Sequence, residues 1–126
     1  MKTWRARWLA ALALWLALLA PVPSAYAHAF LMHAQPAVGS TMTHPPSVLL
    51  LRFSEEVEPT FCRVELTGPD GEIKLDAPQH PAGDPKDLQL ALPPLQPGHY
   101  QVHWRAVSVD THVTQGSFGF TLTHPL

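Results

Sequence analysis

Short runs of alternating apolar and polar residues, separated by prolines, constrain this sequence more than any other feature. Successive side chains of a β-strand point to opposite faces of a sheet, so a period of two is typical of half-buried strands. The clearest run places one apolar set and one polar set on its two faces, namely Tyr100, Val102, Trp104 and Ala106 against His99, Gln101, His103 and Arg105.

Similar segments recur along the chain after residue 28, and no stretch there has a convincing helical period of 3.6 residues. With the 100–107 run they predict about seven short strands: 30–34, 48–53, 62–66, 72–75, 88–92 and 116–122. Prolines fall between these segments, where a missing N–H costs no ladder hydrogen bond. We therefore predict an all-β, single-domain antiparallel sandwich. Its longest loop is expected at 76–87.

Cys62 is the single cysteine, so no intramolecular disulfide can form and the fold depends on its core alone. It alternates in phase with Val64 and Leu66, which predicts a small buried strand residue. A soft ligand for copper is the alternative reading of this thiol.

Residues 1–27 have the pattern of a secretory signal peptide. Basic residues precede an apolar run over 9–20, and Ala25-Tyr26-Ala27 offers small residues for cleavage. The alternative is a membrane anchor, but a spanning helix needs about 20 apolar residues and this run is shorter. We expect cleavage before His28 and one exported domain over 28–126.

The charge balance of the expected domain is acidic. The whole chain has eight Lys and Arg against ten Asp and Glu, and three of its basic residues lie in the signal segment. Such a domain lacks the basic patch that phosphates require, so we expect no nucleic-acid partner. A cationic ligand suits it better.

His28 becomes the N-terminal residue if cleavage falls there. Its α-amine and its ring Nδ1 can then bind one metal ion together, in a six-membered chelate ring. Asp110 and His112 form a second candidate pair in the sequence Asp110-Thr111-His112. In an extended segment their side chains point the same way.

Together these donors give three nitrogens and one oxygen, an inventory that fits a tetragonal Cu(II) site. Zn(II) takes similar ligands but prefers a tetrahedral arrangement. An isolated Asp-x-His pair is more often part of a surface turn than a ligand pair. The expected N-terminal histidine favours the ligand interpretation.

The sequence resembles the periplasmic copper-binding proteins of the CopC/PcoC type over essentially all of 28–122. The stretches that carry the resemblance are His28-Ala29, Gln35-Pro36-Ala37, 51–55, 83–86, 98–108, 110–112 and 116–118. This resemblance implies a Greek-key, immunoglobulin-like β-sandwich or barrel with a Cu(II) site at one end. It also implies one Cu(II) per chain, bound by the amine and ring of His28, the carboxylate of Asp110 and the ring of His112.

Two further residues are open candidates near that site. Glu55 is a possible weak ligand or hydrogen-bond acceptor by the resemblance; otherwise it is a solvated carboxylate. His33 lies five residues from His28 and could reach the metal region. Some relatives carry a methionine-rich loop that binds Cu(I), but 66–87 here has no methionine, so we expect no separate Cu(I) site.

These observations favour a monomeric copper carrier or buffer of the periplasm, acting in copper resistance or homeostasis and not an enzyme. An inner-membrane copper transporter or another periplasmic copper protein would be its partner.

Two alternatives remain. An N-terminal histidine also occurs in copper oxidases of the lytic polysaccharide type. The small domain, its single tryptophan after residue 28 and the carboxylate of Asp110 weigh against that. A metal-free β-sandwich module is the other alternative.

Overall fold

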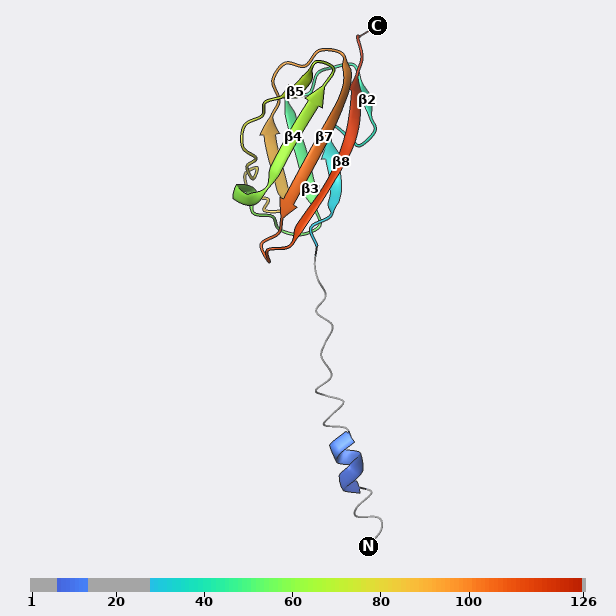
Figure 1. Cartoon of the computed structure of the whole chain (residues 1–126), viewed down its shortest axis with the longest axis vertical. Helices are drawn as coiled ribbons and strands as arrows, with labels where there is room; N and C mark the ends of the chain where they lie inside the picture. Colours follow the sequence, from blue (N-terminus) through green and yellow to red (C-terminus); the bar gives the residue numbers. More distant parts are fainter. Residues whose placement is uncertain (1–6, 14–27, 126) are drawn as a thin grey trace.

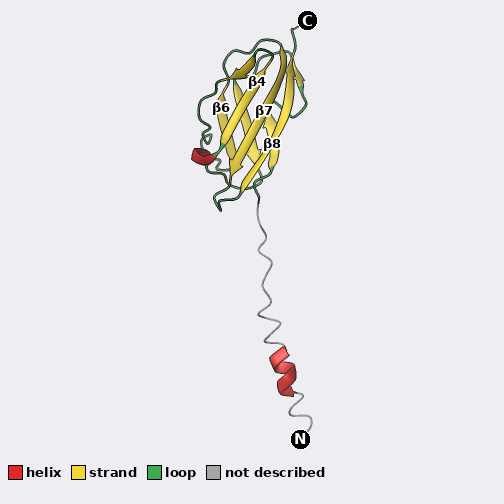
Figure 2. Ribbon diagram, viewed as in Figure 1, coloured by secondary structure: helices red, strands yellow, loops and turns green. Residues whose placement is uncertain are grey.

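Two β-sheets packed face to face contain every named strand of the described chain (Figures 1 and 2). The computed structural model describes residues 7–13, which are helical, and residues 28–125. Most of the predicted signal peptide, including its cleavage site, lies outside the described residues. Within the described ranges, no helix combines the length and the hydropathy needed to cross a bilayer.

The smaller sheet has three antiparallel strands in the order β1-β3-β6. They are β1 (Leu31–Gln35), β3 (Val48–Phe53) and β6 (Asp87–Ala91).

The larger sheet has five strands in the order β2-β8-β7-β4-β5. They are β2 (Thr41–Met42), β4 (Arg63–Gly68), β5 (Gly71–Ile73), β7 (Gly98–Val107) and β8 (Val113–Leu122), and a 3-10 turn η1 (Pro59–Phe61) precedes β4. The two longest strands, β7 and β8, form a hairpin that is paired from Gly98↔Leu122 to Val107↔Val113.

The core lies between the sheets and contains one alternate set of residues from each long strand. In β3 these are Leu49, Leu51 and Phe53, all at most 1% exposed. Trp104 of β7 is half-buried, and its ring lies 5.3 Å from that of Phe53, edge to face. Every residue of this core lies between Ala29 and Leu122, so the segment from residue 28 onward contains the whole described core.

The all-β sandwich prediction is confirmed, with two differences in detail. The two-residue strand β2 was not predicted, and it pairs with β8 in parallel rather than antiparallel. A strand of two residues is too short to show a period, and its position is set by long-range hydrogen bonds such as Gly39 N to Gly119 O (2.7 Å). Cys62 is buried, as predicted, just before β4, and the amide of Val107 donates to its Sγ at 3.4 Å.

Strand ends from both sheets meet at the end of the domain where residue 28 enters (Figure 1). There β3 and β7 finish, and β1 and β8 begin. Residues just outside these four ends are therefore neighbours in space although they are distant in sequence.

The buried face of β3 can be tested by truncating one side chain. Leu51→Ala is expected to lower the free energy of unfolding by about 2–5 kcal/mol, because it leaves a cavity between the sheets. Val48→Ala, at an exposed position of the same strand, is the control and is expected to change it by less than about 1 kcal/mol. Denaturant titration of both variants measures the difference, and equal effects would contradict this assignment of the core.

Candidate metal centre

The hairpin loop between β7 and β8 carries two of the predicted ligands. Val107 and Val113 are the last paired residues, so 108–112 must reverse the chain. Thr111 adopts a left-handed conformation (φ 73°), and the amide of Ser108 donates to the carbonyl of His112 at 3.0 Å. Our prediction that Asp110 and His112 lie on an extended segment is therefore wrong, because the closing of the hairpin requires a turn here.

The turn nevertheless brings Asp110 and His112 together. Oδ2 of Asp110 lies 3.0 Å from Nδ1 of His112. The other carboxylate oxygen, Oδ1, accepts a hydrogen bond from the hydroxyl of Ser108 and a longer one, 3.4 Å, from the amide of His112. The Ser108 hydroxyl, followed by His112, lowers the pKa of Asp110, so its carboxylate stays negative in mild acid.

Two hydroxyl groups hold the segment 28–30 at the same end of the domain. Ser54 Oγ, just after β3, donates to the carbonyl of His28 at 3.0 Å and accepts from the amide of Phe30 at 2.9 Å. Thr114 Oγ1, in β8, donates to the carbonyl of Ala29 at 2.7 Å. We call these three hydrogen bonds the N-terminal clamp. Ala29 is completely buried between them, so the segment is attached to both sheets.

The clamp places the ring of His28 beside the ring of His112. Their centroids are 5.1 Å apart, and the planes meet at 81°. The ring of Phe30 also lies near that of His28, with centroids 6.0 Å apart. Because a ring nitrogen binds a metal ion at about 2.0 Å, two imidazoles at this separation can reach one ion after small rotations.

The described side chains of the candidate ligands are not arranged around one common point, as the ligands of a metal ion would be. Among residues 7–13 and 28–125, no three His, Cys, Asp or Glu side chains are grouped as a metal site. Asp110 contacts His112 directly, so an ion between them needs the side chains to rotate. The expected fourth donor is the α-amine of His28, a main-chain group that exists only after cleavage before this residue.

The two open candidates differ in position. Glu55 follows Ser54 directly and is half-buried at the same end of the domain. His33 is exposed on β1, where it pairs with Arg52 of β3. His99 and His103, which the sequence places on the polar face of their strand, are exposed, and so is His80.

Sequence reasoning missed the residues that hold the candidate ligands in place. Ser54, Ser108 and Thr114 each make the hydrogen bonds described above, and Ser108 is only 2% exposed. Serine and threonine at strand ends are common, and their partners are set by tertiary contacts. The presence of Ser54 and Ser108 within the stretches shared with the CopC/PcoC type was the only available indication.

Comparison with known proteins agrees with the fold. The family model for the CopC domain matches residues 31–123, and the chain belongs to the CopC family. Protein YobA of Escherichia coli (strain K12) is 41% identical over 102 residues, which cover 79% of this chain and 82% of that protein. Copper resistance protein C of Xanthomonas campestris pv. juglandis is 36% identical over 107 residues, covering 79% and 83%.

Solved structures of the family are similar throughout the domain. The crystal structure of CopC from Methylosinus trichosporium OB3b superposes with a TM-score of 0.73 at 29% identity, covering 79% of this chain and 97% of that one. PcoC from Escherichia coli, a methionine-rich copper resistance protein, gives a TM-score of 0.67 at 33% identity, covering 77% and 100%.

The N-terminal clamp generates a direct prediction. Ser54→Ala removes the hydroxyl that bonds residues 28 and 30, so the Phe30 amide is expected to exchange with solvent about tenfold faster, or more. The free energy of unfolding is expected to fall by about 1 kcal/mol. Amide hydrogen exchange by NMR measures the first effect, and Ser117→Ala, an exposed position of β8, is the control. Unchanged exchange at Phe30 would contradict the clamp.

Proposed function

We propose that this protein is an exported copper-binding protein that carries or buffers one Cu(II) per chain, in copper resistance or homeostasis. The observation that supports this most directly is the N-terminal clamp, which holds His28 beside His112 and Asp110. Relatives in the CopC family that are named copper resistance proteins support the choice of copper.

The donor set favours Cu(II) in our proposal. Removal of residues 1–27 would free the α-amine of His28, which would bind the ion together with its own ring. The ring of His112 and the carboxylate of Asp110 would complete three nitrogens and one oxygen. Cu(II) favours such N and O donors in a tetragonal arrangement and lies at the top of the divalent affinity series.

Asp110 would have two roles in this scheme. Before the ion binds, its Oδ2 contacts Nδ1 of His112 at 3.0 Å and helps to orient that ring. When the ion arrives, its carboxylate would turn toward the metal and neutralise part of the charge. The Ser108 hydroxyl contacts Oδ1 rather than the oxygen facing His112, so it leaves Oδ2 available for the ion.

A single Cu(II) site fits the methionine content. After residue 28 the only methionines are Met32 and Met42. Met32 is 68% exposed on β1 and Met42 is half-buried on β2. Soft thioethers favour Cu(I), so a methionine-poor domain suits a Cu(II) carrier.

Export and a transport partner are part of the same proposal. The signal pattern of residues 1–27 supports export to the periplasm, and we propose that the exported domain acts there as a monomer. Copper transport protein CutJ of Bacillus subtilis (strain 168) matches 94% of this chain, at 26% identity, with only 22% of its own length. In that relative a similar segment belongs to a longer transport protein, which supports a membrane copper transporter as the partner here.

The role of the free α-amine can be tested with two forms of the domain. The form that begins at His28 is expected to bind one Cu(II) with a nitrogen-rich tetragonal EPR spectrum. A form with one extra glycine before His28 is expected to bind at least about tenfold more weakly, a loss of about 1.4 kcal/mol, since the chelate ring cannot form. Competition titration measures both affinities. Equal affinities would exclude His28 as the anchor.

The role of His112 can be tested against an exposed histidine. His112→Ala is expected to weaken Cu(II) binding sharply while the thermal midpoint stays within a few degrees. His103→Ala, on the outer face of β7, is the control and is expected to bind copper normally. Calorimetric titration and thermal unfolding of both variants make the comparison. Weak and equal copper binding by both variants and the parent would favour the metal-free alternative.

A further inference from the structure

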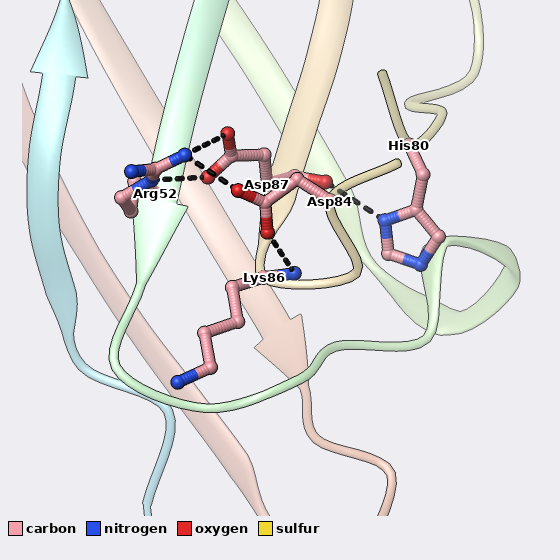
Figure 3. Close-up of polar contacts among 5 residues, drawn as sticks. All are labelled: Arg52, His80, Asp84, Lys86 and Asp87. Atoms are coloured by element: carbon pink, nitrogen blue, oxygen red, sulfur yellow. Dashed lines mark hydrogen bonds and ion pairs between the residues drawn. The ribbon is translucent and has the colours of Figure 1, made fainter. Parts of the chain in front are cut away.

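Arg52 occupies the centre of an ion-pair network on the smaller sheet (Figure 3). Its Nε and Nη2 atoms donate to the two carboxylate oxygens of Asp87, each at 2.8 Å. Nη2 also contacts Asp84 Oδ2 at 2.6 Å. The hydrogen bond with Asp87, then the two negative charges, raises the pKa of Arg52, so the guanidinium stays charged.

Asp87 is buried by the loop that precedes β6. It is 3% exposed, its carbonyl contacts Nδ1 of His80 at 2.8 Å, and the amide of Lys86 donates to Asp84 at 3.1 Å (Figure 3). A carboxylate removed from water needs a partner of opposite charge, and Arg52 supplies it. The network therefore fixes the loop 80–87 against the end of β3.

That loop holds the segment 54–57 by its main chain. The amide of Phe53 donates to the carbonyl of Lys86 at 2.9 Å, and the amide of Val57 donates to that of Pro85 at 3.1 Å. These two hydrogen bonds attach the residue just before the segment 54–57 and the last residue of that segment to the loop.

The same segment contacts both parts of the candidate metal centre. Ser54 forms two bonds of the N-terminal clamp. Val57 forms an isolated bridge with Ser108, and the carbonyl of Glu56 accepts from the amide of Val109 at 3.1 Å. The distance between His28 and the hairpin loop thus depends on where 54–57 lies.

The strand β1 makes that dependence stronger. Its pairing with β3 is irregular between Leu31 and His33, and His33 is paired with Arg52. The clamped segment 28–30 lies immediately before this irregular part of β1. A bulge bends a strand and re-aims its side chains, so it leaves the direction of residues 28–30 to be set by other contacts.

We propose that Arg52, through Asp87 and Asp84, is a positioning residue for the copper site, because it fixes the segment 54–57 that holds His28 and the 108–112 loop at binding distance. This inference rests on the proposed function. Arg52 does not touch the metal; it acts through Ser54, Glu56 and Val57.

Four variants test the proposal on protein made from the full chain and purified after export. Arg52→Gln is expected to weaken Cu(II) binding about tenfold, the lower end for residues that orient ligands. It is also expected to change the EPR parameters and speed amide exchange at Phe30 and Val109. Arg52→Lys keeps the charge but not the two-pronged contact, and is expected to restore binding only in part. Asp84→Asn, which changes the exposed partner, is expected to cause a smaller loss.

The matched control is Arg63→Gln. Arg63 also pairs with a carboxylate, Glu65 Oε1 at 3.3 Å, but on the outer face of β4 in the other sheet, where its side chain is 77% exposed. This variant is expected to bind copper as the parent does.

The outcomes separate the two proposals. If the parent protein binds copper no better than His112→Ala, the proposed function fails. If the parent binds tightly and the folded Arg52 variants match it in affinity, EPR spectrum and exchange, Arg52 only stabilises the fold and this inference is overturned. Should Arg52→Gln not fold, Arg52→Lys and Asp84→Asn decide the question, and parent-like affinity and spectra in both would overturn it.

Discussion

The N-terminal clamp is the interaction on which the candidate metal centre depends. Two hydroxyls, one after β3 and one in β8, hold the carbonyls of residues 28 and 29. Without them, His28 would lie on an unpaired segment ahead of β1, and its donors would be free to move away from the hairpin loop. With them, one residue contributes to a site whose other members lie at the far end of the sequence.

The packed sheets fix the backbone positions around the candidate metal centre, whereas the ligand side chains can still rotate. The core side chains of β3 and the long β7–β8 hairpin fix where the strand ends lie. The imidazoles and the carboxylate, by contrast, contact one another at the surface of the domain end. The proposed carrier role would benefit from this combination, since ligands that rotate can accept an ion and also release it.

Charge has separate roles on the two sides of the segment 54–57. On one side, Arg52 neutralises a buried carboxylate and fixes a loop. On the other, Asp110 keeps its negative charge at an exposed position, where its pKa is lowered by Ser108 and His112. The contact between Arg52 and the buried carboxylate of Asp87 suits a structural role, whereas the exposed carboxylate of Asp110 is available to a cation.

The sequence by itself determined the strands and the candidate ligands. A period of two marked the long strands such as β3 and β7, because burial on one face acts on every second residue. It could not mark β2, which is two residues long. The sequence predicted that the side chains of Asp110 and His112 lie close together, and they do. The reason is a turn rather than an extended segment, since residues two apart can meet in either. The resemblance implied that His28 joins them, but only the tertiary structure decided how it is held there, because its neighbour Ala29 meets Thr114 across 85 residues through hydroxyl contacts that no local pattern encodes.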